Sequence, residues 1–381
     1  MDNTPAADSK SFNIYQKRQE NLARALETAG FNGLALNPGP SLVYLTGLHF
    51  HTSERPVIAL FLPPNSPIMI LPELEKAKLE NKSYSIRAFT YGEDPSTWGA
   101  VFAQAIETSG LNTSSIGIEP LHLRLLEYNL LQPAAPQARF SSAEACLSEL
   151  RMQKDESELN AMRKAVQIAQ QGLLATLPKI KPGISELQIA SELTLQLIQA
   201  GSEAQLAFPP IVSSGPNSAN PHAAPSERLL ASGDLLVIEW GASYQGYVSD
   251  LTRTFAIGTV EPEYQKIAQI VLEANSAGRQ AGGPGKAAEQ VDIAARAVID
   301  AAGYGPFFFH RTGHGLGIEV HEPPYMRSGN QLVLHPGMTY TVEPGIYLGG
   351  RGGVRIEDDV VITDRGSESL SDLPRQLTNL G

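Results

Sequence analysis

The amino-acid sequence predicts two domains: an N-terminal domain in which helices and strands alternate, and a C-terminal domain of two helices followed mainly by strands. The length of 381 residues exceeds what one hydrophobic core usually fills. Apolar residues make up 42% and charged residues 18% of the chain, as in an ordinary globular protein. The stretch from Gln132 to Ala145 is rich in Ala, Pro and Ser and marks the boundary region. We divide the chain into residues 1–150 and 151–381.

Alternating helix and strand signals in the N-terminal domain indicate an α/β unit. Leu22 and Leu26 lie at helical spacing, and Gly30 supplies a stop signal. We therefore expect a helix from Tyr15 to Ala29. Short apolar runs predict strands at Gly33–Leu36, Leu42–Leu45 and Ile116–Ile118.

The run PVIALFLPPNSPIMILP is the most apolar early stretch of the chain. It is too short to span a bilayer, and prolines interrupt it. We expect two buried strands joined by a turn at Pro63-Pro64-Asn65-Ser66.

The C-terminal domain begins with helical patterns. The charged segment from Leu147 to Leu177 has apolar residues near helical spacing, and Pro182-Gly183 ends this first helical region. A second helix is expected from Ser185 to Ala200, with Gly201 after it. Beyond Phe208 the pattern changes to strands, turns and short helices.

The charge balance and the single cysteine narrow the function classes. A formal net charge of −11, without a basic stripe, argues against a nucleic-acid partner. Cys146 is the only cysteine, so no intrachain disulfide can form, which fits a reducing compartment. The N-terminal residues MDNTPAADSKSF lack the basic start and apolar stretch of a secretory signal. We therefore expect a cytoplasmic protein without a membrane partner.

Two acids lie in the run VIEWGASYQGYVSDLTRTF, which predicts a β-hairpin that turns near Gln245-Gly246. A two-residue loop places Glu239 opposite Thr252. Asp250 then lies diagonally from Glu239 on the same face, within reach of a shared ion. A change of one residue in the loop length would reverse that face, and two solvated edge acids are the alternative interpretation.

Two histidines flank a glycine-rich turn. His314 lies between glycines in GHGLG, and we expect these glycines to keep bulk away from an imidazole that approaches a metal. His321 follows seven residues later and precedes Glu322-Pro323-Pro324. A lone histidine is more often structural, but two around one turn favour a functional site. Imidazole nitrogen together with carboxylate oxygens suits Mn, Co, Fe or Zn rather than Ca.

Two further acids lie in apolar strands, where a buried carboxylate is costly unless it is paired or bound to a metal. Glu343 lies in MTYTVEPGIY, in which Pro344-Gly345 is expected to bend the strand. Glu357 lies in GVRIEDDVVIT, across a Gly-rich turn, so a second hairpin brings both acids to one side. Alternation places Asp359 on the face of Glu357 and Asp358 on the other face, and both neighbours are alternatives to Glu357.

A cluster of these acids would be strongly self-repelling. At about 4 Å, each like-charge pair costs roughly 4 kcal/mol at an effective dielectric constant of about 20. Two divalent cations would remove this cost. The sequence therefore predicts a hydrolase built around two metal ions, with five candidate ligands: Glu239, Asp250, His314, Glu343 and Glu357.

These motifs resemble those of the pita-bread metallopeptidase family, which includes Xaa-Pro dipeptidase (prolidase), Xaa-Pro aminopeptidase and methionine aminopeptidase. The N-terminal run LVYLTGLHF is similar to a family motif, and all later motifs occur in family order. The resemblance covers nearly the whole chain. It implies an α/β N-terminal creatinase-like domain and an α+β C-terminal pita-bread catalytic domain.

The resemblance also implies roles for individual residues. The five candidate ligands correspond to the family's dinuclear metal ligands, with Asp250 and Glu357 in the bridging positions. Glu343 corresponds in addition to the residue that shuttles a proton. His222, in SSGPNSANPHAAPS, corresponds to the upstream active-site histidine, and His321 to the histidine that contacts substrate near the scissile bond.

Arg355 lies two residues before Glu357, on the same strand face. From this position it either supports that ligand or binds a substrate carboxylate. We therefore count Arg355, with His222 and His321, among the expected substrate-binding residues.

The activity that the resemblance implies is metal-dependent hydrolysis of Xaa-Pro dipeptides through a water activated by two divalent ions. Mn²⁺ is the expected ion, with Co²⁺ and Zn²⁺ as alternatives. The expected partners are a small Xaa-Pro peptide and a second copy of the chain in a homodimer. Proline's tertiary amide has no N–H, so a site without an acceptor at that position favours it.

Glu239 departs from the family, which nearly always has Asp at this position in an Asp-x-Gly pattern. The longer side chain displaces the carboxylate, and a misplacement near 1 Å can cost about 10²-fold in rate. We therefore keep three alternatives open: an Xaa-Pro aminopeptidase acting on longer peptides, a catalytically weakened pita-bread binding module, and a metal-free creatinase-like enzyme.

Overall fold

The computed structural model describes residues 9–80 and 82–380. The chain splits into two compact units, Met1–Arg151 and Met152–Gly381, which are described separately. Residues 1–8 of the stretch that argued against a secretory signal lie outside the described residues. Among the described residues, none of the helices combines the length and the apolar character that a bilayer crossing requires.

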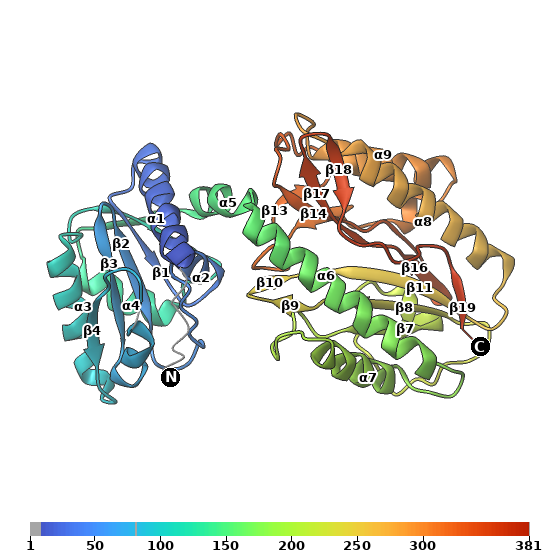
Figure 1. Cartoon of the computed structure of the whole chain (residues 1–381), viewed down its shortest axis with the longest axis horizontal. Coiled ribbons are helices and arrows are strands. Elements are labelled where there is room, and N and C mark those ends of the chain that lie inside the picture. Colours follow the sequence, from blue (N-terminus) through green and yellow to red (C-terminus); the bar gives the residue numbers. More distant parts are fainter. Residues whose placement is uncertain (1–8, 81, 381) are drawn as a thin grey trace, which may run out of the picture. The chain divides into compact units, whose positions relative to one another are not determined.

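A six-stranded mixed sheet forms the centre of the N-terminal unit (Figure 1). Its elements in chain order are α1 (Ser9–Ala29), β1 (Gly33–Leu36), α2 (Pro40–Thr46), β2 (Ile58–Leu62), β3 (Asn65–Pro72), η1 (Glu73–Leu79), β4 (Arg87–Tyr91), α3 (Pro95–Ser109), β5 (Ser115–Ile118), α4 (Leu125–Ala134), β6 (Arg139–Ser142) and α5 (Glu144–Met152). The strand order is β4-β3-β2-β1-β5-β6. Strands β1, β5 and β6 are parallel, whereas β2 is antiparallel to β1 and β3. Apolar residues of α3 and α4 pack against this sheet.

Most predicted elements of this unit are confirmed, but one predicted strand is wrong. Helix α1 ends before Gly30, and β2 and β3 form the expected apolar pair of strands joined at Pro63-Pro64. Leu42–Leu45, predicted as a strand, lies in α2. Pro40 begins that helix with a favourable fixed φ, and Gly47 ends it in the left-handed conformation at φ 65°. A short apolar run by itself does not distinguish a strand from a buried helix.

The boundary between the units lies at Arg151 and Met152, one residue beyond our division into 1–150 and 151–381, whereas the stretch from Gln132 to Ala145 is not the boundary region. That stretch contains the end of α4, all of β6 and the start of α5. Because β6 pairs in parallel with β5, the stretch is an integral part of the N-terminal sheet. Its composition resembles that of a linker, but its backbone hydrogen bonds belong to the sheet.

The C-terminal unit contains two helix pairs, α6 with α7 and α8 with α9 (Figure 1). Its sheets have the orders β19-β11-β8-β7 and β13-β12-β14-β17-β18, with the strand pairs β9-β10 and β15-β16 in addition. The elements are α6 (Glu156–Thr176), η2 (Leu177–Lys179), α7 (Glu186–Gln199), β7 (Ile211–Ser214), η3 (Gly215–Ala219), β8 (Leu235–Trp240), β9 (Ser243–Tyr244), β10 (Tyr247–Val248), β11 (Leu251–Ile257), α8 (Pro262–Ala281), α9 (Glu289–Ala301), η4 (Gly305–Phe307), β12 (Gly313–Gly315), β13 (Glu322–Met326), β14 (Thr339–Val342), β15 (Gly345–Leu348), β16 (Gly352–Arg355), β17 (Asp358–Thr363), β18 (Gly366–Ser369) and β19 (Thr378–Leu380).

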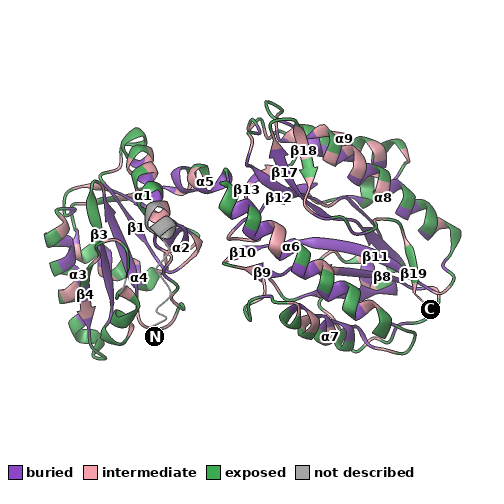
Figure 2. Ribbon diagram, in the orientation of Figure 1, coloured by how far each residue is buried: buried purple, intermediate pink, exposed green. Residues whose placement is uncertain are grey.

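Each helix pair has its own hydrophobic core. Leu193 of α7 and Trp240 of β8 are fully buried in the first core, where the Trp240 indole N–H donates to the Ala169 carbonyl at 2.8 Å. Ile267 of α8 and Ile346 of β15 are fully buried in the second core. Figure 2 shows the strands between the helix pairs as buried. Polar side chains on these strands are therefore shielded from bulk water.

The charged segment Leu147–Leu177, expected to form one helix, forms α5 and α6. Asp155 separates them with a capping box: its carboxylate accepts from the Glu158 N–H at 3.0 Å, and the Glu158 carboxylate accepts from the Asp155 N–H at 2.8 Å. The second predicted helix is confirmed as α7, with Ser185 as its N-cap and Gly201 after its end.

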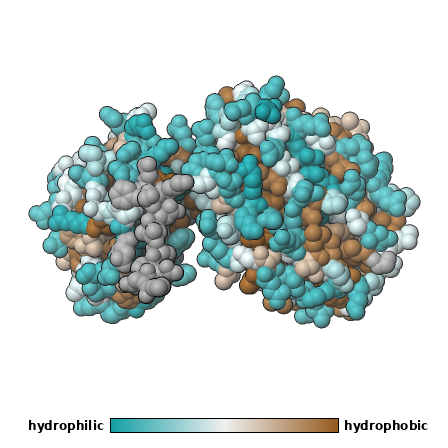
Figure 3. Space-filling model, viewed as in Figure 1, coloured by the Kyte–Doolittle hydropathy of each residue, from teal (hydrophilic) through white to brown (hydrophobic). Residues whose placement is uncertain are grey.

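Apolar and polar residues are mixed on the visible face of the C-terminal unit (Figure 3). Helices α6 and α7 expose several large apolar side chains: Leu174, Leu187, Leu195 and Ile198. Exposed apolar residues are common on protein surfaces, so we assign no interface to them.

Candidate metal centre

The hairpin that carries Glu239 and Asp250 has the predicted register. Glu239 of β8 lies opposite Thr252 of β11, and Tyr244 lies opposite Tyr247 across the two-residue loop. The same face of β11 therefore leads from Thr252 to Asp250. The loop-length argument from the sequence is confirmed.

Asp250, His314 and Glu357 form a buried group that could hold a metal ion, with one ligand atom of each residue within 4.8 Å of the others. His314 Nε2 lies 3.6 Å from Asp250 Oδ2 and 3.3 Å from Glu343 Oε1. The Nδ1 of His314 is 3.1 Å from the Gly315 carbonyl, which can only accept a hydrogen bond. Nδ1 therefore carries the proton, and the Nε2 lone pair faces the acids.

The glycines beside His314 allow the neighbouring strands to approach closely. A Cβ atom on Gly313 would lie 1.8 Å from the Thr341 carbonyl oxygen, and one on Gly315 would lie 2.3 Å from the Pro323 carbonyl oxygen. The two glycines let β12 approach β14 and β13 closely. They therefore help to place His314 through strand packing, and their expected role in keeping bulk away from its ring stays a prediction.

Glu343 and Glu357 lie where a long hairpin is interrupted. Strand β14 pairs with β17, and β15 pairs with β16 across the Gly-rich turn, but the two acids lie in the break between these pairings. The expected second hairpin and the bend at Pro344-Gly345 are confirmed. From this break, the Glu343 carboxylate reaches His314, and the Glu357 carboxylate lies close enough to Asp250 for its charge to act there.

Thr252 connects β11 with the second hairpin. Its hydroxyl donates to Glu357 Oε2 at 2.6 Å, and its carbonyl accepts from the Glu357 N–H at 3.1 Å. Nearby, the Asp250 N–H donates to Asp359 Oδ2 at 3.1 Å. Asp359 thus lies on the Glu357 side, as strand alternation predicts.

Glu239 is placed differently from the other acids. Its carboxylate forms an ion pair with the Arg355 guanidinium, and its side chain is 17% exposed. Arg355 also donates through Nε to Thr252 Oγ1 at 3.2 Å and through Nη1 to the Tyr347 hydroxyl at 3.0 Å and the Pro221 carbonyl at 3.2 Å. Burial lowers the pKa of Arg355 to about 10, so it stays charged at neutral pH.

Of the two roles considered for Arg355, these contacts favour the supporting one. Each of its three guanidinium nitrogens contacts protein atoms, and the side chain is 3% exposed. The charge of Arg355 also offsets that of Glu357, whose carboxylate shares the Thr252 hydroxyl with it. A direct contact of Arg355 with substrate stays a prediction.

Three histidines lie close to one another beside the acid cluster: His222, His310 and His321. His222 and His321 are exposed, and the His321 ring lies edge-on to His314 with the ring centres 4.2 Å apart. His310 is more buried: Nδ1 donates to the Arg311 carbonyl at 2.7 Å, so Nε2 accepts from the Tyr347 hydroxyl at 2.9 Å.

Burial, with a smaller contribution from His222, lowers the pKa of both His321 and His310, in the latter case to about 4. The sequence analysis missed His310, and it interpreted Tyr347 as core rather than as a pocket residue. The only signal for His310 in the sequence was its position four residues before His314. Tyr347 lies in an apolar strand, where aromatic residues are usually core.

Burial raises the pKa of Asp250, Glu343 and Glu357, and the charge of Glu357 raises it further for the first two. Burial also lowers the pKa of His314 well below its usual range. Within the described part of the chain, Asp250 Oδ1 is buried without a hydrogen-bond donor. A divalent cation of the Mn, Co or Zn type fits this arrangement, which combines the lone pair of a neutral imidazole, carboxylate oxygens and an acceptor without a donor.

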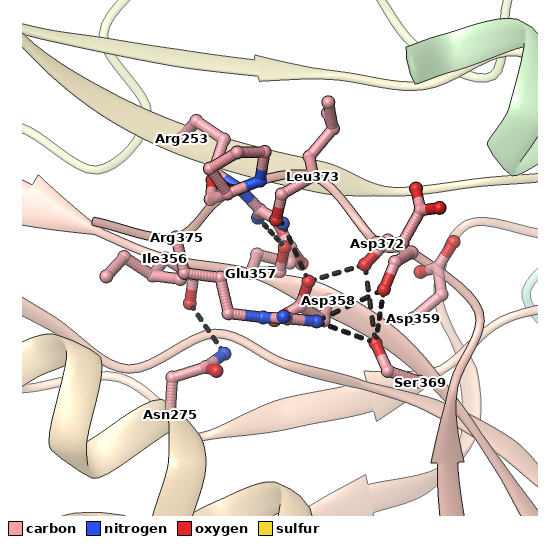
Figure 4. A network of polar contacts seen from close by, with 12 residues as sticks. Arg253, Asn275, Ile356, Glu357, Asp358, Asp359, Ser369, Asp372, Leu373 and Arg375 are labelled. Atoms are coloured by element: carbon pink, nitrogen blue, oxygen red, sulfur yellow. Dashed lines mark hydrogen bonds and ion pairs between the residues drawn. The ribbon is translucent and has the colours of Figure 1, made fainter. Parts of the chain in front are cut away.

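An arginine network fixes the strand behind Glu357 (Figure 4). Asp358 accepts from Arg253 Nη2 at 2.8 Å and from Arg375 Nε at 2.6 Å, while Arg253 Nη1 donates to the Glu357 carbonyl at 2.7 Å. Burial alone would raise the pKa of Asp358, but the two arginines outweigh it and hold that pKa at about 2. Asp358 is thus the counter-ion of the arginines, on the side predicted from alternation.

Comparisons with known proteins agree with this geometry. Residues 160–364 match metallopeptidase family M24, and residues 18–153 match the creatinase/prolidase N-terminal domain. An Xaa-Pro dipeptidase of Pyrococcus horikoshii is 31% identical over 96% of this chain and 99% of its own length.

Two solved structures are similar over almost their full length. A dipeptidase of Pyrococcus horikoshii OT3 has a TM-score of 0.90 at 36% identity, covering 95% of this chain and 100% of that one. A recombinant prolidase from Thermococcus sibiricus has a TM-score of 0.91 at 34% identity, covering 97% and 99%. The predicted combination of a creatinase-like α/β domain and an α+β pita-bread catalytic domain is confirmed.

Replacing Asp358 with Asn should destabilise the fold, because it leaves buried arginines without their counter-ion. We expect the free energy of unfolding to fall by about 3 kcal/mol. Since the folded pKa is below the usual 3.8, the contribution of Asp358 is present above about pH 4 and is lost as the pH falls toward 2. Urea denaturation at pH 7 measures the loss, with the exposed Asp364→Asn as control. Equal stability of the two variants would contradict this assignment.

Binding of a divalent ion to the metal-free protein should release protons. The raised pKa values of Asp250 and Glu343 mean that the empty site holds protons that an ion displaces, whereas the low pKa of His314 means that its ligand nitrogen is already free. Affinity for Mn²⁺ should therefore increase with pH. Titration calorimetry in two buffers of different ionisation enthalpy measures the release. Identical apparent enthalpies in both buffers would rule it out.

Proposed function

The chain belongs to metallopeptidase family M24, and we propose that it hydrolyses Xaa-Pro dipeptides with the help of two divalent metal ions. The observation that carries the proposal is the buried group of Asp250, His314 and Glu357, with Glu343 at 3.3 Å from the free nitrogen of His314. These residue types, most of them shielded from water, are suited to metal-assisted hydrolysis.

The proposed ligand assignment rests on the family resemblance, and the closeness of Asp250, His314, Glu343 and Glu357 supports it for these four residues. Asp250, His314, Glu343 and Glu357 would hold one ion, and Glu239 would hold the second together with Asp250 and Glu357. When bound, the ions neutralise the acids and lower the pKa of a water molecule, which supplies the nucleophile near neutral pH. We propose Mn²⁺, with Co²⁺ and Zn²⁺ as alternatives, because mixed imidazole and carboxylate donors suit these ions.

Glu343 is the residue that we propose for proton transfer. Its Oε1 lies 3.3 Å from Nε2 of His314, so its carboxylate is close to the proposed ions and to the water that they activate. Its side chain is 16% exposed, more than those of Asp250 and His314, and so it faces the open side of the site. From there it takes the proton of the attacking water and delivers it to the leaving nitrogen.

His222 and His321 lie on the open side of the acids, where substrate enters. Both side chains are exposed, and His321 contacts the ring of His314. We propose that their N–H groups position the substrate and stabilise the negative charge that develops on the scissile carbonyl oxygen.

Two further predictions accompany this proposal and rest on the sequence alone. We propose a homodimer, as the family resemblance implies, and a cytoplasmic location, which fits the single cysteine of the chain. The retention of the acids and both histidines argues against a catalytically weakened binding module or a metal-free enzyme.

Turnover of Ala-Pro should exceed turnover of Ala-Pro-Ala if the chain is a dipeptidase rather than an aminopeptidase. Activity should disappear after chelation and return when Mn²⁺ is added. Both peptides are compared at equal concentration by release of the N-terminal alanine, which cleavage before proline frees from each of them. Preference for the tripeptide would support the aminopeptidase alternative, and unchanged activity after complete metal removal would exclude the metal mechanism.

Replacing Glu239 with Asp should strengthen binding of the second ion by about 10-fold. The shorter side chain weakens the ion pair with Arg355 and restores the side-chain length that the family usually has at this position. Glu239→Gln should retain one ion per chain and lose the other. Elemental analysis after equilibration at defined free Mn²⁺ gives the number bound. Two ions retained by the Gln variant would show that Glu239 is not a ligand.

A further inference from the structure

A fully buried carboxylate lies in the first turn of α7, outside the acid cluster. Glu186 is 0% exposed and follows the N-cap residue Ser185. Its carboxylate faces the segment from Ser214 to Ser226, which contains His222. The proposed function gives this carboxylate no role.

One oxygen of Glu186 holds the start of this segment. Oε1 accepts from the Ser214 N–H at 2.6 Å and from the Ser214 hydroxyl at 2.8 Å. The Asn217 side-chain amide lies 3.1 Å from both carboxylate oxygens. Strand β7 and the first turn of η3 are thus tied to α7.

The other oxygen holds the end of the segment. Oε2 accepts from the Ser226 N–H at 3.1 Å and from the Ser226 hydroxyl at 2.6 Å. One carboxylate therefore joins both ends of the segment through backbone and side-chain donors. A carboxylate suits this task because both of its oxygens only accept, whereas an amide would turn N–H groups toward donors.

The middle of the segment is set against the strand that carries Arg355. The Ser218 hydroxyl accepts from the Gly353 N–H at 2.9 Å, and a Cβ atom on Gly353 would lie 2.2 Å from the Ser218 carbonyl oxygen. Arg355 donates to the carbonyl of Pro221, the residue directly before His222. The backbone of His222 therefore depends on anchors at the base and at the middle of the segment.

We infer that Glu186 is a positioning residue that holds His222 over the acid cluster by closing the base of segment 214–226. The inference rests on the proposed function, in which His222 acts on the substrate. A carboxylate that served the fold alone would affect stability without acting through His222.

The test compares Glu186→Gln with Glu192→Gln, the same change on α7 at a residue whose carboxylate pairs with Lys179 at 2.5 Å near the surface. For Ala-Pro hydrolysis by the Mn²⁺-loaded enzyme, we expect kcat of the Glu186 variant to fall on the order of 10- to 100-fold. The Glu192 variant should stay close to the parent. Mn²⁺ uptake should be unchanged in both.

A double-mutant cycle separates positioning from a general loss of fold. If Glu186 acts through His222, then adding Glu186→Gln to His222→Ala should lower kcat no further than His222→Ala alone. Multiplicative losses in the double variant would overturn the inference. If the Glu186→Gln variant does not fold, the Ser226→Ala variant takes its place in the cycle, because it removes one hydroxyl donor to Glu186. The same two outcomes then decide.

Hydrogen–deuterium exchange of segment 214–226 gives a readout that needs no catalysis. Exchange should accelerate at least several-fold in Glu186→Gln and not in Glu192→Gln. If exchange accelerates in Glu186→Gln but the parent protein fails to cleave Xaa-Pro peptides, the anchoring role is retained and the proposed function is overturned. An active parent with unchanged exchange in the Glu186 variant would overturn the inference.

Discussion

The burial of several like charges in one place is the constraint on which the C-terminal unit depends. Asp250, Glu343 and Glu357 all have raised pKa values, and Asp250 has an oxygen that no described residue satisfies. Such an arrangement is unfavourable in a protein interior unless cations compensate for it. The free nitrogen of His314 points to the same place, so the compensation that fits is a metal ion rather than a protein cation.

The protein's own cations are arranged around the cluster rather than inside it. Arg253 and Arg375 pair with Asp358 behind the ligand strand, and Arg355 pairs with Glu239 beside it. These contacts hold the backbone of both hairpins while leaving the carboxylates of Asp250 and Glu357 available. Glu186 completes this scaffold on the side of His222. The surrounding ion pairs thus fix the geometry, and the cluster offers its oxygen and nitrogen atoms as ligands to the ions.

Local rules were sufficient to predict much of the site. The two-residue loop fixed Glu239 opposite Thr252, and strand alternation separated Asp358 from Glu357, because both follow from the two-residue period of a strand. They failed where the outcome depends on distant partners. The Glu239–Arg355 pair and the part played by His310 join segments far apart in the sequence, which spacing does not reveal. Leu42–Leu45 lies in a helix because Pro40 and Gly47 set the ends of that helix. The apolar character of the run does not reveal these ends.

The central claim is that the acid cluster is a metal site centred on Asp250, His314 and Glu357. Anomalous diffraction at the manganese edge, from crystals of Mn²⁺-loaded protein, tests this most directly. A strong peak within about 2.0–2.3 Å of the nitrogen of His314 and of oxygens of both acids is the predicted result. A loaded crystal with no peak at these three residues, or with peaks only elsewhere on the chain, would contradict it.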